Sequence, residues 1–345
     1  MRLRDVRSYE RLDLDLSHGT VLVVGPNGVG KTNLLEALHV GTQGFSPRTR
    51  VDAQLIRFGQ DAGRITVRGT RESTPAEVEV TLRRREGKRV RMNGAVLPSA
   101  EQLRSELTTL VFTPDRLAVV KGGPAVRRAY VDRSLGRLLR PHVSAPGRYG
   151  AALSHRNASL RRVAAGVSDR DALAPWTEQV AELGADLVAA RQETLRLLEP
   201  LFVERAGELG LEGASLSYEG TPPTVEALEA RIGRDLERGF TTLGPHLDDV
   251  AIHAGDRDLR LFGSQGEQRL AVLALLLAEA AVLAERGRPA LLLLDDVLSE
   301  LDGARRSALA ARIATGGQTV ITATSAGALP AEPAQLVEVC PGVAA

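Results

Sequence analysis

Eight consecutive residues near the N-terminus have the composition and spacing of a phosphate-binding loop. Residues 25–32 read Gly-Pro-Asn-Gly-Val-Gly-Lys-Thr and match the pattern G-x-x-x-x-G-K-[ST]. In such a loop the glycines let backbone N–H groups curl around a phosphate, and the helix that follows directs its positive N-terminus at the same anion. Lys31 would neutralise the β- and γ-phosphates, and the Thr32 hydroxyl would ligate Mg²⁺. The residues expected to hold ATP here are Gly25, Pro26, Asn27, Gly28, Val29, Gly30, Lys31, Thr32 and Asn33.

A run of four leucines ends in two adjacent carboxylates, Asp295 and Asp296. The run predicts a buried strand, and ligands of open α/β sheets bind at the carboxyl ends of strands. Asp295 would hold Mg²⁺, directly or through water, and Asp296 would orient or deprotonate the attacking water. Two solvated acids at a strand end are the commoner case in general. The phosphate loop favours the catalytic interpretation, with Lys31, Asp295 and Asp296 as its residues.

A third segment, Ser264, Gln265, Gly266 and Glu267, precedes a long apolar helical pattern. Ser264 can cap that helix, and Glu267 three residues later completes a capping box. The same helix start could also offer its N–H groups, the Ser264 hydroxyl and the Gln265 amide to a γ-phosphate. The structural and the nucleotide-binding interpretations are compatible.

Two basic clusters are candidates for contacts with DNA phosphates. Residues 83–91 predict a β-hairpin that turns at Glu86-Gly87, with six positive residues against Glu86 alone. A second cluster begins at Arg127 and Arg128. A solvated charged face is the alternative for either cluster by itself. The residues expected to contact DNA are Arg83, Arg84, Arg85, Lys88, Arg89, Arg127 and Arg128. Aromatic residues are only 3% of the chain, which disfavours readout by base stacking.

The elements that would position these residues follow from hydrophobic periodicity. A strand at 21–24 and a helix from Lys31 to about Val40 flank the phosphate loop, and a long helix is expected from Glu267 to about Arg286. Further strands are expected at residues 65–67, 78–82, 109–112, 250–253, 259–262, 290–294 and 319–322. Between residues 125 and 236 the helical period dominates, with Pro200 among the residues expected to separate its helices and Trp176 in its core. The prediction is an α/β head, residues 1–122 and 237–345, split by a helical arm at 123–236.

Composition narrows the class of protein further. The 345 residues include 44 Lys and Arg against 43 Asp and Glu, so any DNA site must come from local patches rather than from net charge. The single cysteine, Cys340, excludes an intramolecular disulfide framework and suits a reducing cytoplasm. No signal peptide or membrane anchor is expected.

Several segments together resemble one family. The phosphate loop, the Ser-Gln-Gly segment, the acidic pair and the Ser-Glu-Leu-Asp loop at 299–302 are similar to an ABC-type P-loop ATPase head. The match narrows to the RecF family, of the SMC-like superfamily. The segments that carry it are residues 25–37, 112–115, 121–124 with Arg127 and Arg128, 155–157, 244–249 and 294–302. They are spread over most of the chain, including the arm.

The resemblance implies an α/β fold with an ABC-type head and an inserted helical arm. It implies a cytoplasmic protein of recombinational gap repair and the SOS response, with ATP and Mg²⁺ as cofactors and a slow, DNA-dependent ATPase activity. ATP would drive homodimerisation, as the signature of one subunit closes on the nucleotide of the other. The dimer would clamp DNA near single-/double-strand junctions and help load the recombinase RecA through RecR.

Some features depart from the family pattern or stay open. Leu247 stands where the family usually has Arg, and Glu267 replaces a second Gln. The glutamine-loop residue is not assigned: Gln60 and the 112–115 loop are both candidates. Arg7 and Tyr9 could contact the adenine or simply pack. Alternative functions are an SMC-type mechanical ATPase, a transporter's ATPase subunit, and an ATP-latched DNA-binding module with negligible hydrolysis.

Overall fold

The computed structural model describes residues 1–71, 74–340 and 343–344, and the chain forms two compact units. The first unit comprises Met1–Arg116, Glu208–Gly210 and Ala280–Ala345, and the second comprises Leu117–Gly207 and Leu211–Glu279. The division into an ATPase head and an arm at residues 123–236 stays a prediction. The two compact units describe how the chain packs, and packing alone does not assign a function to each part. No helix in the described ranges is long and apolar enough to cross a membrane.

A mostly parallel sheet forms the first layer of the first unit. Its strand order is β15-β14-β3-β13-β12-β8, with every pair parallel except β14 with β15. The strands are β3 (Thr20–Val24), β8 (Thr109–Phe112), β12 (Leu291–Leu294), β13 (Thr319–Ala323), β14 (Gln335–Cys340) and β15 (Val343–Ala344). The central strands are nearly continuous runs of buried apolar residues, as expected for a parallel sheet covered on both faces. Because β3 and β12 are close to each other in this sheet, the phosphate loop and the acidic pair end at the same edge.

A second, antiparallel sheet has the order β2-β1-β4-β5-β6-β7. Its strands are β1 (Arg2–Val6), β2 (Tyr9–Asp13), β4 (Ala62–Arg71), β5 (Thr74–Arg83), β6 (Gly87–Met92) and β7 (Ala95–Val96). Apolar residues alternate with polar ones, so that Val78, Val80 and Leu82 of β5 are buried while the residues between them are more exposed. The β5–β6 hairpin confirms the predicted hairpin.

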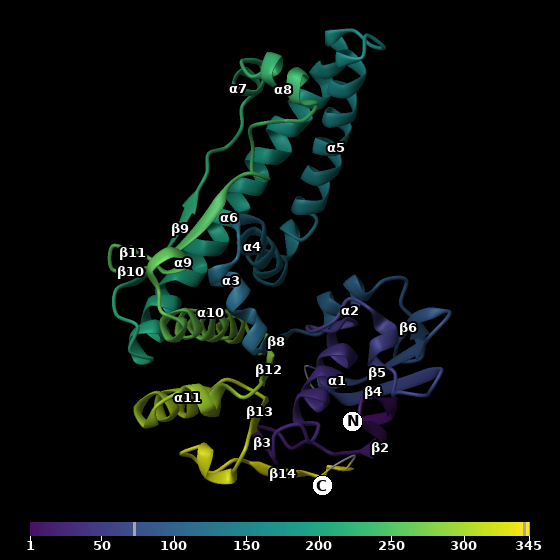
Figure 1. The fold of residues 1–345 in the computed structure, drawn as a ribbon, viewed down its shortest axis with the longest axis vertical. Coiled ribbons are helices and arrows are strands. Elements are labelled where there is room, and N and C mark those ends of the chain that lie inside the picture. The colour runs from purple at the N-terminus through teal and green to yellow at the C-terminus, as the bar shows by residue number, and fades with distance from the viewer. Residues whose placement is uncertain (72–73, 341–342, 345) are drawn as a thin grey trace. The chain divides into compact units, whose positions relative to one another are not determined.

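Helix α1 (Lys31–Gln43) packs against both sheets of the first unit (Figure 1). Its buried Leu34, Leu38 and Val40 share one core with side chains of both sheets, such as Val80 and Val320. The remaining elements of this unit are η1 (Asp52–Leu55), α2 (Ala100–Glu106), η5 (Val297–Glu300), α11 (Gly303–Thr315) and η6 (Ala326–Ala328), and η2 (Pro114–Leu117) ends at its boundary.

The second unit is mainly helical. Its elements are α3 (Ala118–Lys121), α4 (Pro124–Leu138), η3 (Arg140–His142), α5 (Ala145–Ala164), η4 (Arg170–Leu173), α6 (Ala174–Glu208), β9 (Ala214–Glu219), α7 (Val225–Glu229), α8 (Ile232–Arg238), β10 (Asp249–Ala254), β11 (Arg257–Asp258), α9 (Leu259–Phe262) and α10 (Gln265–Glu285). Helix α10 continues into the first unit from Ala280 to Glu285, and α6 reaches it only with its last residue, Glu208. Leu135, Tyr149, Val180, Leu187 and Leu228 form its core.

Four expectations are corrected. Residues 259–262 form helix α9 rather than a strand, because a four-residue apolar run has no clear period and Asp258 caps the helix. Helix α6 runs through Pro200 without ending, since Leu198 and Phe202 continue its buried face on both sides. Trp176 is only half-buried and stacks on His155, with ring centroids 4.6 Å apart. Strand β9 lies in the part of the chain expected to be helical.

Candidate nucleotide site

The phosphate loop connects β3 to α1, and two of its glycines are required by the space around them. A side chain at Gly25 would bring a Cβ within 2.6 Å of the Val339 carbonyl oxygen. Gly30 has a φ of 121°, and a Cβ there would lie 3.1 Å from the hydroxyl of Tyr9. An L-residue at either position would therefore force the loop to move, and the glycine pattern follows from backbone geometry as well as from phosphate binding.

The Lys31 ammonium group is held over this loop. Its Nζ donates hydrogen bonds to the carbonyl oxygens of Gly25 and Pro26, at 2.6 and 2.9 Å, and only 7% of the residue is exposed. Phosphate oxygens are stronger acceptors for an ammonium group than neutral carbonyls. The positive charge of Lys31 is therefore already beside the loop, and the ammonium group can leave the two carbonyl oxygens for the oxygens of a bound phosphate.

Three residues distant in sequence meet at the carboxylate of Asp295. The hydroxyls of Thr32 and Thr322 both donate to its Oδ1, at 3.1 and 2.8 Å, and only 5% of Asp295 is exposed. Burial raises the pKa of Asp295, while the two hydroxyl bonds act in the opposite direction. The sequence motifs place Thr32 and Asp295 at one site, whereas no motif points to Thr322.

These donors suit the Mg²⁺ that the sequence implies. Mg²⁺ binds through oxygen ligands, and with nucleotides it uses one or two protein groups and takes the rest from phosphates and water. The Thr32 hydroxyl and the Asp295 carboxylate, 3.1 Å apart beside the phosphate loop, are such a pair. A nearby cation would also offset the cost of the buried negative charge on Asp295.

The backbone of Asp296 is fixed in the left-handed region, with φ 50°. Its N–H donates to the Thr322 hydroxyl at 2.8 Å, and its carbonyl accepts from the Ser299 hydroxyl at 2.9 Å. A non-glycine residue at positive φ is uncommon, and such strain gathers at functional sites. Asp296 is half-buried, and these backbone hydrogen bonds position it next to Asp295. Its carboxylate is therefore positioned by the backbone rather than by a hydrogen bond of its own.

Arg7 and Tyr9, for which the sequence left adenine contact and packing open, belong to two hydrogen-bond networks behind the loop. The Tyr9 hydroxyl, fully buried, donates to the Gly30 carbonyl at 3.2 Å, and burial raises its pKa to about 12. Arg7 forms two hydrogen bonds to the buried carboxylate of Glu36, both at 2.8 Å, and Ser46 donates a third at 2.6 Å. These bonds favour the packing interpretation of Arg7 and Tyr9 over contact with adenine. Glu36 and Ser46, which complete the second network, carry no sequence signal of their own because this network forms only in the folded chain.

The signature segment lies at the start of α10 in the second unit. The capping box is confirmed: the Ser264 hydroxyl accepts from the Glu267 N–H at 3.2 Å, and the Glu267 carboxylate accepts from the Ser264 N–H at 2.8 Å. A hydrogen bond from Arg257, together with those of Ser264, lowers the pKa of Glu267 to about 2. Immediately before the box, Leu261 and Phe262 are 66% and 67% exposed. Gln265 and Gly266 form the first turn of α10, so the helix begins two residues before the expected Glu267.

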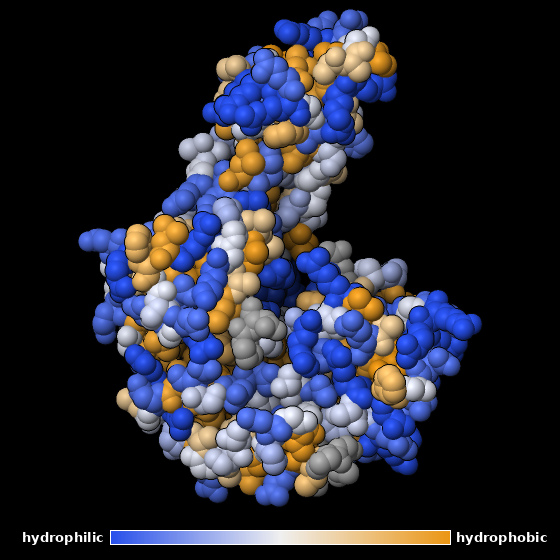
Figure 2. Space-filling view, in the orientation of Figure 1, coloured by the Kyte–Doolittle hydropathy of each residue, from blue (hydrophilic) through white to orange (hydrophobic). Residues whose placement is uncertain are grey.

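The predicted DNA contacts divide into accessible and buried residues. Arg83, Arg84, Arg85 and Arg89 are exposed around the β5–β6 hairpin, and Lys88 lies 3.1 Å from Asp52. Figure 2 shows hydrophilic residues gathered over this hairpin, where Figure 1 labels β6. Arg83 pairs with Glu86 at 2.9 Å, and Arg84 lies 3.7 Å from Asp61.

The prediction for Arg127 is corrected by its surroundings. This side chain is only 4% exposed and forms an ion pair with Asp249 at 2.5 Å. It also donates to the Gly122 carbonyl at 2.6 Å, so its guanidinium serves the fold of the second unit. Arg128 is half-buried and donates to the Asp248 carbonyl at 2.6 Å, which leaves it only partly available.

Comparisons with known proteins agree across the whole chain. The sequence model for the RecF/RecN/SMC N-terminal domain family matches residues 1–341. The DNA replication and repair protein RecF of Heliobacterium modesticaldum is 33% identical over 339 residues, covering 94% of this chain and 91% of that protein. RecF of Lacticaseibacillus paracasei is 34% identical over 340 residues, again covering 94% of this chain and 91% of its own length.

Solved structures of RecF are also similar to this chain. The recombination mediator protein RecF, solved with ATP and assigned to the RecFOR pathway, is similar with a TM-score of 0.87 and 27% identity, covering 100% of this chain and 95% of that chain. An SMC head bound to the C-terminal winged-helix domain of ScpA has a TM-score of 0.60 at 16% identity, covering 99% of this chain and 94% of that chain, and shows the shared α/β fold.

Proposed function

The chain belongs to the RecF family of DNA replication and repair proteins, and from this premise we propose that it is an ATP-driven DNA clamp of recombinational gap repair. The observation that carries the proposal is the meeting of Thr32, Thr322 and Asp295 beside the phosphate loop. These residues come from three separate parts of the chain. A nucleotide site that works without Mg²⁺ has no need of a buried carboxylate with two hydroxyl donors at its edge, whereas one that holds ATP with Mg²⁺ does.

The residues of the first unit would then act as follows. Lys31 turns from the loop carbonyls to the β- and γ-phosphates of ATP, and the loop N–H groups of residues 25–33 surround them. Thr32 and Asp295 would hold Mg²⁺, which when bound would offset negative charge on the phosphate oxygens. Asp296 orients a water molecule for in-line attack and accepts its proton. Its side chain is shorter than the glutamate of many related ATPases, which favours a slow turnover.

A second copy of the chain completes the site. The Ser264 hydroxyl, the Gln265 amide and the first N–H groups of α10 can bind a γ-phosphate presented by another molecule. The exposed Leu261 and Phe262, which immediately precede them, offer apolar surface for that closure. ATP would therefore bridge two subunits, and hydrolysis would release them.

The clamp would hold DNA at single-/double-strand junctions through phosphate contacts, in the cytoplasm. By the family relationship, RecR and through it the recombinase RecA are the proposed partners. A second candidate, an ATP-latched DNA-binding module with negligible hydrolysis, shares every residue except the catalytic use of Asp296. Turnover in the presence of gapped DNA distinguishes the two.

The test of the nucleotide site is Lys31→Met. Loss of the ammonium removes the charge that offsets the phosphates, and we expect ATP affinity to fall by at least about 100-fold, measured by calorimetry with Mg²⁺. Because Lys31 is bonded to the loop carbonyls, circular dichroism and thermal unfolding must show that the variant is folded. Lys121→Met, an exposed lysine of α3, is the matched control and should bind ATP normally. Normal affinity in folded Lys31→Met would refute the proposed nucleotide site.

A further inference from the structure

The outer face of the antiparallel sheet carries a row of arginines that only the strand register reveals. Arg11 of β2 lies opposite Arg4 of β1, Arg4 lies opposite Arg64 of β4, and Arg64 lies opposite Thr81 of β5. Thr81 in turn lies opposite Arg89 of β6. Directly paired residues of neighbouring strands point to the same side of a sheet. Five adjacent strands thus present Arg, Arg, Arg, Thr and Arg in one line, which we call the arginine row.

The row lies on the solvent side of the sheet. The four arginines are exposed, whereas the neighbours that alternate with them, such as Leu3, Ile65 and Val90, are buried in the core. Three further arginines share this face in the adjacent rows: Arg2, Arg83 and Arg91. Asp13 and Glu79 are the carboxylates at these paired positions, so the three rows together carry seven arginines and two acids; farther along the same face Arg68 lies opposite Glu77.

Like charges directly opposite one another destabilise a sheet. Arg64 is partly compensated by Glu79, at 3.5 Å, but no ion pair joins Arg4, Arg11 or Arg89 to another residue in the described ranges. The repulsion between these aligned arginines therefore lowers the stability of the sheet, and no carboxylate in the described part of the chain offsets it at Arg4, Arg11 or Arg89. This is expected where an external anion supplies the compensation.

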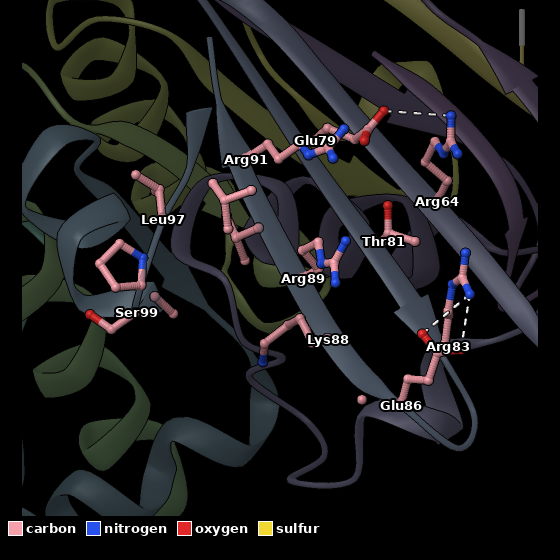
Figure 3. Close-up of a pocket in the computed structure, with 15 residues that line it drawn as sticks. Arg64, Glu79, Thr81, Arg83, Glu86, Lys88, Arg89, Arg91, Leu97 and Ser99 are labelled. Atoms are coloured by element: carbon pink, nitrogen blue, oxygen red, sulfur yellow. Dashed lines mark hydrogen bonds and ion pairs between the residues drawn. The ribbon is translucent and has the colours of Figure 1, made fainter. Parts of the chain in front are cut away.

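A concave surface surrounds part of the row. Arg64, Thr81, Arg83, Arg89 and Arg91 line a hollow of about 740 Å³, and Figure 3 shows their side chains on the same side of β4, β5 and β6. A second hollow of about 660 Å³ adds Arg4, Arg84 and Arg85 beside Arg64 and Arg83. Guanidinium groups on both sides of the Thr81 hydroxyl are the donor set that a phosphate group accepts.

We infer that the arginine row and its hollows bind the phosphate backbone of duplex DNA. The inference rests on the proposed function and deepens it, because it moves the main contact surface from the hairpin turn to the outer face of the sheet. With about 4.8 Å between strands, the row is roughly 19 Å long. One compact anion cannot occupy that length, whereas it matches about five phosphates of one strand at ~3.4 Å along the duplex axis.

The chemistry of the face also selects among polyanions. The exposed outward positions of β4, β5 and β6 that the structure describes are mainly arginines, threonines and carboxylates, and none of them is an aromatic side chain that could stack an unpaired base. Backbone contacts by arginine position a duplex without reading its sequence. Binding is therefore expected to be independent of sequence and steeply dependent on salt.

The experiment compares three triple variants in the full chain, each losing three positive charges. The row variant is Arg4→Ala, Arg11→Ala, Arg89→Ala. The turn variant is Arg83→Ala, Arg84→Ala, Arg85→Ala. The matched control is Arg196→Ala, Arg234→Ala, Arg238→Ala, three exposed arginines of the second unit outside both predicted clusters. The probe is a fluorescent gapped duplex, titrated with ATP and Mg²⁺ at 50 to 250 mM salt. ATP affinity and thermal unfolding are measured in parallel.

We expect the row variant to bind DNA at least about 10-fold more weakly at 100 mM salt, with the slope of log K against log salt reduced by about 3. The control should keep the wild-type slope, and ATP affinity should not change in any variant. Lysine at the same three row positions should restore most of the slope, because it restores the charge. The turn variant should lose less than the row variant.

Three results would contradict the inference or the proposed function, each in a different way. If the wild type binds gapped DNA but the row variant keeps its affinity and slope, the row is not the DNA surface and the proposed function stands. If the wild type fails to bind DNA with ATP present, the proposed function fails first. Polyglutamate serves as an acidic-protein probe: a row variant that loses binding to it but keeps binding to DNA would assign this face to a protein partner and overturn the inference.

Discussion

The hydroxyl of Tyr9 touches the phosphate loop from behind, at the carbonyl of Gly30. Its pKa of about 12 keeps it protonated, and therefore donating, at any physiological pH. We predict that Tyr9→Phe leaves the fold intact and lowers the free energy of unfolding by about 0.5–1.5 kcal/mol, the net contribution of one hydrogen bond. ATP affinity should fall by several-fold because the loop is less fixed. Urea unfolding and calorimetry check both; wild-type affinity in this variant would exclude Tyr9 from positioning the loop.

At the same scale, Asp296 separates the two candidate functions. Its backbone is held by Thr322 and Ser299, so an amide in place of the carboxylate leaves those bonds in place. We predict that Asp296→Asn keeps ATP binding and dimerisation but slows hydrolysis at least about 10-fold, because an amide cannot accept the proton of water. Phosphate release with gapped DNA is the measurement. Unchanged hydrolysis would assign the base to another residue and leave Asp296 a supporting role.

At the scale of elements, one histidine couples two segments of the second unit. The Tyr149 hydroxyl of α5 lies 2.7 Å from His246 Nδ1, and His246 Nε2 lies 3.0 Å from the Thr241 carbonyl. Burial, and then the positive charge of Arg128, lower the pKa of His246 despite the bond to Thr241 and the nearby Asp248 and Asp235. The neutral ring is therefore the folded form, with Nε2–H donating to Thr241 and Nδ1 accepting from Tyr149.

The pH dependence follows from that lowered pKa. As pH falls below about 6.5, the unfolded chain binds a proton at His246 before the folded chain does, so acid destabilises the fold until the lower, folded pKa is passed. We predict that, as pH is lowered from 7.5 to 5, the midpoint temperature of thermal unfolding falls more steeply for the wild type than for His246→Gln. The difference between the two curves isolates this residue from the carboxylates. Parallel curves would show that His246 titrates alike in both states.

At the scale of the whole molecule, the signature is useful only if another subunit brings a nucleotide to it. We predict a monomer or weak associate without nucleotide and a dimer with ATP and Mg²⁺, measured by light scattering. Ser264→Arg should keep ATP binding and abolish the dimer, since a long cation replaces the capping hydroxyl. Ser154→Arg, at an exposed position of α5, is the control and should dimerise normally. A dimer that forms equally without ATP in wild type and Ser264→Arg would refute the proposed clamp.

The sequence by itself determined the parts of this protein that local chemistry specifies. The glycine spacing of the phosphate loop, the leucine run before Asp295, the capping box at Ser264 and the hairpin around Glu86 are each complete within about ten residues. Strand β8 was predicted to the residue, because the apolar run 109–112 is bounded by Pro114. The family followed from these segments together, since their order along the chain is itself a signal.

The tertiary structure decided everything that depends on which distant segments meet. Thr322 reaches Asp295 only because β13 lies beside β12, and Arg127 is buried only because Asp249 lies across from it, 122 positions along the chain. The arginine row exists only in the register of strands from residues 2–13, 62–71 and 74–92, where a shift by one residue would turn each arginine to the core. Spacing in sequence carries no information about such pairings, because register is fixed by the buried face of the whole sheet.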